Sequence, residues 1–224
     1  MPTPCYEGER LDACISRLTA LHEDMFSRLP QAALEKCARK LGMPRREKLG
    51  RNAPFEPAVL KDYAVWGLAL AGTTVARRYA SAPALAPDTL DPVLLPAMAE
   101  ADFSLYSVEA TLDIHQVRVV DLLTDRSEKV DSRLTICPRM PSGMVVAGWG
   151  VRVSDTLVWG AGSLPMTPRQ REVLTTMLSG PYPRVTGGLG ELRASAANDP
   201  GRLAAFVTKS VLDARLYTLN SASE

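Results

Sequence analysis

Ser104-Leu-Tyr-Ser-Val-Glu-Ala-Thr-Leu-Asp113 is the stretch that decides the fold of this chain. Apolar and polar side chains alternate along it. One face carries Tyr106, Val108, Ala110 and Leu112. The opposite face carries Ser107, Glu109, Thr111 and Asp113. A period of two with one apolar face predicts a half-buried antiparallel strand.

Two hairpins are predicted after this strand, over residues 116–133 and 144–164. Their turns are expected near Thr124-Asp125-Arg126 and Ser154-Asp155-Thr156, where turn-forming residues interrupt the apolar pattern. Residue parity places the side chains of Trp149 and Trp159 on apolar faces, which predicts that both indoles belong to the core. We therefore expect a small, strongly bent antiparallel sheet or partly open barrel at about residues 104–165.

On both sides of this β-module, apolar residues recur at helical spacing and are bounded by residues typical of helix starts and ends. Helices are predicted over 9–29, 31–41, 58–80 and 92–101, after Thr167-Pro168, and after Asp199-Pro200. The predicted fold class is therefore α+β, with N- and C-terminal helices around the sheet. The predicted organisation is an N-terminal helical arm (1–57), a helix plus β core (58–178), and a linker with a C-terminal helix (179–224), forming one compact unit.

Composition is that of an ordinary globular protein. The 224 residues are 46% hydrophobic and 23% charged, with a formal net charge of +1. So small a net charge argues against a general polyanion binder or a strong attraction to membrane surfaces. No segment approaches the length of apolar sequence that a membrane helix needs, so no membrane partner is expected.

The cysteines predict a reducing compartment. Cys5, Cys14, Cys37 and Cys137 are scattered, without a C-x-x-C pair. The first residues lack the basic and apolar regions of a signal peptide. We therefore expect reduced thiols and a cytoplasmic protein.

No catalytic constellation is evident, and we predict no catalytic residue, metal site or cofactor. The chain has two histidines and no serine in a G-x-S-x-G motif. His22 lies one position beside the apolar stripe of the first helix, and His115 lies at the turn after Asp113-Ile114. Both are interpreted as ordinary surface or boundary residues.

Charge is distributed in blocks. Residues 36–51 are strongly basic, whereas residues 79–117 contain six acids and no lysine or arginine. Residues 34–43 are similar to the first helix and turn of a helix-turn-helix, although Pro54 and Pro57 interrupt the expected second helix. If the basic segment binds nucleic acid, the residues expected to contact it are Lys40, Arg45, Arg46, Lys48 and Arg51. Mutual compensation of the two blocks, within the chain or across a homodimer, is the favoured interpretation.

The stretch from Asp62 to about Leu174 resembles the uncharacterised core of some bacterial proteins that carry a SEC-C motif. The resemblance rests on residues 103–109, on the D-L-L-T-type hairpin beginning at 117, and on residues 143–165. It implies a helix leading into a strand, followed by two hairpins, and no established reaction. The cysteine-rich SEC-C motif itself is absent from this sequence, so neither zinc nor docking through that motif is implied.

Three functions therefore remain open from the sequence. The preferred one is a non-catalytic cytoplasmic binding or adaptor module that acts through a protein partner or self-association. The first alternative is a nucleic-acid-binding regulator that uses the basic segment 36–51. The second is an enzyme whose site is assembled only by the fold, which a deep pocket gathering His115 with acids of shifted pKa would favour.

Overall fold

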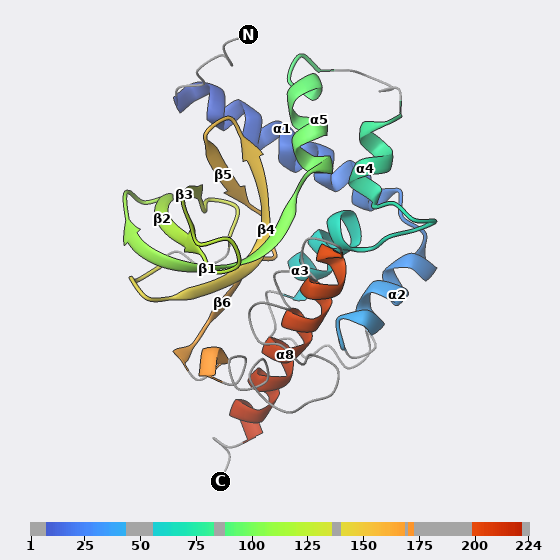
Figure 1. The fold of residues 1–224 in the computed structure, drawn as a ribbon. Coiled ribbons are helices and arrows are strands. Elements are labelled where there is room, and N and C mark those ends of the chain that lie inside the picture. Colours follow the sequence, from blue (N-terminus) through green and yellow to red (C-terminus); the bar gives the residue numbers. More distant parts are fainter. Residues whose placement is uncertain are drawn as a thin grey trace.

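The computed structural model describes residues 8–43, 56–82, 88–135, 140–168, 170–172 and 199–220. A β-barrel forms one side of the molecule and helices form the other (Figure 1). The helices are α1 (Gly8–Ser27), α2 (Gln31–Lys40), α3 (Glu56–Asp62), the π-helix η2 (Tyr63–Gly67), α4 (Val75–Ala80), α5 (Asp91–Ala99) and α8 (Pro200–Asn220). The strands are β1 (Asp102–Thr111), β2 (Gln116–Asp121), β3 (Arg126–Asp131), β4 (Val145–Val153), β5 (Thr156–Trp159) and β6 (Leu164–Met166).

Five strands close into a barrel in the order β1-β2-β3-β5-β4, with β4 returning to β1. β1 is shared, because its first half pairs with β4 and its second half with β2. The pairing of β3 with β5 is parallel and the other pairings are antiparallel. This order, with its one parallel pair, is the topology of an OB-type barrel. β6 extends the sheet beside β4.

Two separate apolar cores follow from side-chain alternation on β1 and β4. Residues of one parity, such as Tyr106 on β1 and Val146 on β4, point into the barrel. Residues of the other parity, such as Phe103 and Trp149, pack against the helices. The barrel core consists of Tyr106, Val108, Val117, Val119, Val130, Met140, Val146, Leu157 and Trp159. Burial of both indoles is thus confirmed, although they lie in different cores.

The α+β class, with helices from both ends of the chain around a small bent barrel, is confirmed. The predicted hairpin turns occur at residues 122–125 and 154–155. Thr167 and Gln170 form the reciprocal capping box that the sequence predicts: the Gln170 amide donates to Thr167 Oγ1 at 3.2 Å, and the Thr167 amide donates to Gln170 Oε1 at 2.8 Å. The rest of that predicted helix and residues 173–198 lie outside the described residues.

Three predictions of detail are wrong. The sheet is not wholly antiparallel, because β3 and β5 run parallel. The expected continuous helix over 58–80 breaks into α3, η2 and α4, because the chain turns extended at Leu68 and reverses at Ala71-Gly72, both at positive φ. Leu112, expected in the core, is exposed, since the register of β1 shifts between Val108 and Ala110.

An ion pair fixes α1 against the start of α5. Arg17 donates from Nε to Asp91 Oδ1 at 2.7 Å and from Nη2 to Oδ2 at 2.8 Å. Asp91 is buried, and its Oδ2 also accepts the Asp88 amide. The hydrogen bond from Arg17 is the main cause that holds the pKa of Asp91 below its usual value.

We predict that Asp91→Asn lowers the free energy of unfolding at pH 7 by about 2 kcal/mol, because a charge-assisted pair is lost. The pKa of Asp91 is lower folded than unfolded, so its contribution is present above about pH 4 and is lost as pH falls through the folded pKa. The difference between variant and wild type should therefore shrink in acid. Urea unfolding at pH 7 and below pH 4 measures this, with exposed Asp155→Asn as control. A difference that is constant with pH would contradict it.

Candidate functional site

A cavity of about 240 Å³ lies where the helical layer meets the barrel. α1 contributes Leu18 and His22 to its lining, and α3 with η2 contributes Asp62 and Trp66. The barrel side contributes Leu134 and the turn Gly160-Ala161 between β5 and β6. The walls are largely apolar, and the charged groups are confined to a few positions. We call this space the His22 cavity.

His22 and Asp62 form a buried pair in this cavity. They are 8% and 2% exposed, and His22 Nε2 lies 3.2 Å from Asp62 Oδ1. The two atoms are at ion-pair distance, yet Nε2 has no hydrogen-bond partner of good geometry. Asp62 Oδ2 accepts the Gly162 amide at 2.8 Å. Because buried polar groups are normally satisfied, an unaligned pair beside a cavity marks this position as unusual.

Two glycines let the β5–β6 turn reach α3. A Cβ on Gly160 would lie 2.2 Å from Asp62 Oδ2 and 2.9 Å from the Trp66 ring. A Cβ on Gly162 would lie 2.6 Å from Val59 Cα. Any side chain at either position would therefore push α3 away from the turn. The close approach places the Gly162 amide against the Asp62 carboxylate.

The π-helix η2 places Trp66 beside His22 and Asp62. Asp62 immediately precedes η2, and Trp66 follows it by about one turn. The Trp66 ring is tilted against His22 at a centroid distance of 4.7 Å and continues to Trp149 at 6.2 Å. Its indole Nε1 is buried without a hydrogen-bond partner. Short π-helical segments frequently occur at functional sites, because they alter the spacing at which side chains project.

An ion pair stands at the rim of the cavity. Lys61 Nζ donates to both carboxylate oxygens of Glu23, at 2.6 and 2.9 Å. The pair links α3 to α1 and is partly exposed, so it contributes little to stability. Lys61 Nζ also lies 5.4 Å from the centre of the Phe26 ring.

The reach of its polar atoms limits the chemistry that this cavity can perform. A general base needs an imidazole nitrogen within reach of the substrate. His22 Nε2 is instead enclosed by protein, so this nitrogen is out of reach of a molecule in the cavity. Thr19, the lining hydroxyl, donates to the Ile15 carbonyl at 2.9 Å. His115, the other histidine, is exposed at the β1–β2 turn as predicted and is not among the residues that line the cavity.

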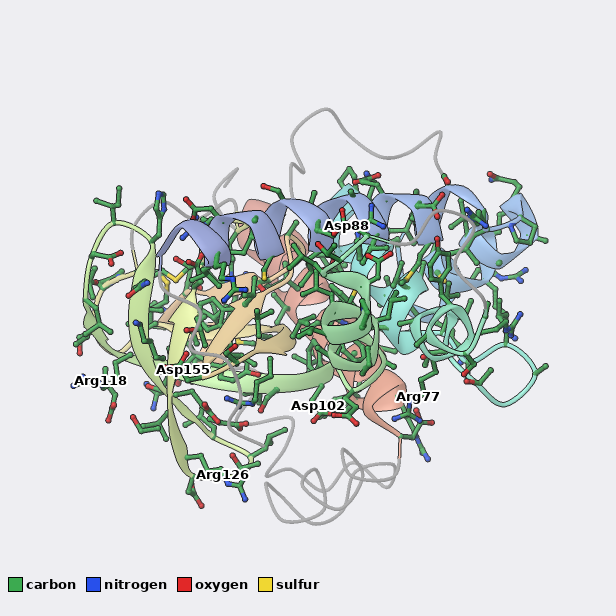
Figure 2. All side chains as sticks on the ribbon, turned by 90° about the horizontal axis from the view of Figure 1, so that it is seen from above. Arg77, Asp88, Asp102, Arg118, Arg126 and Asp155 are labelled. Atoms are coloured by element: carbon green, nitrogen blue, oxygen red, sulfur yellow. The ribbon has the colours of Figure 1, made fainter. Side chains whose placement is uncertain are left out.

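The predicted nucleic-acid contacts lie almost entirely outside the described residues. Lys40 is exposed in the last turn of α2, while Arg45, Arg46, Lys48 and Arg51 are not described. Figure 2 shows Arg118 and Arg126 projecting from the barrel end of the molecule. The large apolar side chains exposed in the described part are aliphatic, namely Val93, Leu112 and Ile114. The aromatic side chains Phe26, Tyr79 and Phe206 are half-buried there.

The cysteines of the described chain are structural. Cys14 and Cys37 are both buried and free. Burial raises the pKa of the Cys37 thiol to about 12, which keeps it protonated and unreactive. Within the described ranges, no cluster of histidine, cysteine and acidic residues could hold a metal ion. No helix there is both long and apolar enough to cross a membrane.

Comparison with known proteins places the chain in a family. The sequence model of DUF7986, a family of unknown function, matches residues 13–142, which is more than half of the chain. The chain belongs to this family. The matched region contains every helical residue that lines the His22 cavity, but it ends before Gly160 and Ala161. No curated protein and no solved structure matches the chain.

Sequence reasoning missed the His22 cavity. The interpretation of His22 as an ordinary surface or boundary residue is wrong, because its ring is buried against Asp62 and Trp66. These partners are 40 or more positions away in sequence, and helical periodicity says nothing about which helices meet. The one available signal was Gly160-Ala161-Gly162 after a strand, since glycines there indicate close backbone approach.

Proposed function

We propose that the chain is a non-catalytic binding module that holds a small ligand in the His22 cavity. The observation that carries this proposal is a mostly apolar cavity whose lining includes a few polar or charged side chains, among them His22, Asp62 and Lys61. An apolar space with a few convergent polar groups is the usual form of a ligand site. Binding at the junction of the helices and the barrel would also stabilise their contact.

The size of the cavity limits the ligand. A dry cavity of about 150 Å³ accepts benzene, so about 240 Å³ suits one ring with a short substituent, about ten non-hydrogen atoms. At about −0.5 kcal/mol per non-hydrogen atom, a probe of about eight such atoms gains about −4 kcal/mol and binds with a Kd of about 1 mM. The natural ligand would bind more tightly than such a probe, because it would carry groups that pair with the polar residues of the cavity.

Benzyl alcohol serves as a neutral one-ring probe, followed by isothermal titration calorimetry and by tryptophan fluorescence. We expect saturable binding with a Kd of about 1 mM. Ala161→Leu fills the cavity and should weaken binding at least tenfold, whereas Ala32→Leu, on the exposed side of α2, should leave it unchanged. Equal binding by wild type and Ala161→Leu, or no binding at all, would contradict the proposal.

The remaining expectations from sequence stay predictions. A cytoplasmic location agrees with the lack of a membrane-spanning helix in the described ranges, and the buried thiols agree with a reducing compartment. Association with a protein partner or a second copy would be measured as the native mass. The kinship to the core of SEC-C-motif proteins and the nucleic-acid role of Lys40, Arg45, Arg46, Lys48 and Arg51 are likewise untested.

A further inference from the structure

We infer that the ligand of the His22 cavity is a one-ring molecule that carries a cationic N–H donor group, such as an amidine or amine. The inference rests on the proposed function and concerns the charge of the ligand. Three observations carry it: the hydrogen bonds of Asp62, the commitment of Lys61 to Glu23, and the enclosure of His22 Nε2 and Trp66 Nε1.

Asp62 has unused acceptor capacity at the base of the cavity. A carboxylate offers about four lone-pair sites. In the structure Asp62 accepts the Gly162 amide at Oδ2, and His22 Nε2 faces Oδ1 at 3.2 Å without an aligned hydrogen bond. A buried carboxylate is costly unless it is paired and hydrogen-bonded. A ligand with N–H donors would supply the missing hydrogen bonds, and a cationic one would supply the opposite charge as well.

The donors of the cavity are already committed or enclosed. Lys61, the lysine at the rim, donates to both oxygens of Glu23. Trp66 Nε1 and His22 Nε2 are buried, so a ligand cannot reach them without displacing side chains. An anionic ligand would be repelled by the Asp62 carboxylate at short range, and it could gain Lys61 only by displacing Glu23 from its ion pair. Asp62 can accept further hydrogen bonds, whereas the donors of the cavity are engaged or enclosed. The cavity therefore favours a ligand that donates hydrogen bonds.

The test uses three probes of one shape and different charge: benzamidine, benzamide and benzoate. Calorimetry on the full chain should rank them in that order, with benzamidine at least tenfold tighter than benzamide and benzoate weakest. In Asp62→Asn, which keeps the shape and an oxygen acceptor, the preference for benzamidine over benzamide should fall below about threefold. Benzamide itself should bind as it does to wild type. The thermal unfolding of Asp62→Asn is measured alongside.

The matched control is the double variant Glu128→Gln, Arg152→Gln, which removes a partly exposed ion pair of the barrel outside the cavity lining and leaves the net charge unchanged. It should retain the tenfold preference. Loss of the preference in this variant but not in Asp62→Asn would overturn the inference, as would tightest binding of benzoate. The wild-type ranking alone decides the matter if Asp62→Asn fails to fold. Binding of all three probes with equal affinity defeats the inference and leaves the proposed function intact, whereas binding of none defeats both.

Discussion

Replacing Gly201 by alanine is expected to lower the free energy of unfolding by about 3 kcal/mol or more. Gly201 lies in the first turn of α8, where α8 crosses the end of η2. A Cβ at this position would lie 2.0 Å from the Gly67 carbonyl oxygen and 2.9 Å from its carbon. Both are backbone atoms, so no rotamer change relieves the clash. Either α8 moves outward or η2, which carries Trp66, must shift.

Helix propensity makes the sign of this result informative. Alanine is favoured over glycine by about 1 kcal/mol in a helix interior and by less in the first turn, so propensity alone predicts a small gain in stability. The close approach to Gly67 predicts a loss. Urea unfolding of Gly201→Ala beside Arg202→Ala, an exposed neighbour in the same turn, separates the two effects. A Gly201→Ala protein as stable as wild type would mean that α8 does not sit on η2 as described.

Replacing Trp159 by alanine is expected to cost about 4 kcal/mol. Trp159 is the largest fully buried side chain of the chain's described part and fills the barrel core. Its ring lies 5.3 Å from that of Tyr106, centre to centre. The loss has two parts. One is the free energy of transferring the indole from water to the core, and the other is the cost of the cavity left behind, because the strands of a closed barrel cannot move inward to fill it.

Two comparison variants sharpen the test. Ile114→Ala, at a position 84% exposed on the β1–β2 turn, should change stability by less than about 0.5 kcal/mol. Trp159→Phe should cost less than Trp159→Ala, because it keeps a ring and removes the indole Nε1, which has no hydrogen-bond partner. Equal losses for Trp159→Ala and Ile114→Ala in chemical denaturation would contradict the barrel core.

Much of the β-module could be predicted because its information is local. The shared inner face of Tyr106 and Val108, the turn residues at Asp125 and Ser154, and the Thr167 cap each depend on a few neighbouring positions, and each is confirmed. The burial of the first half of β1 was harder to predict from the sequence. Both of its faces are buried, one in the barrel and one under the helices, so Phe103 and Leu105 disturb the simple alternation.

The site was not predictable in the same way. The contact of His22 with Asp62 depends on how α1 and α3 cross, and its geometry depends on a turn about 100 residues further along the chain. The break in the predicted helix at Leu68 depends on tertiary contacts too: a Cβ on Gly67 would lie 2.6 Å from the Tyr63 ring and 3.0 Å from Trp149. Such constraints arise only when the elements pack together.

β4 takes part in both cores, and this has a practical consequence for anyone trimming the protein. The region that matches the family ends at residue 142, ahead of β4. A polypeptide cut at that boundary would leave the edge of β1 open and would expose the apolar side of Phe103 and Trp66 that Trp149 covers. We expect it to be insoluble, so boundaries for expression must be drawn beyond β6 and not where sequence similarity stops.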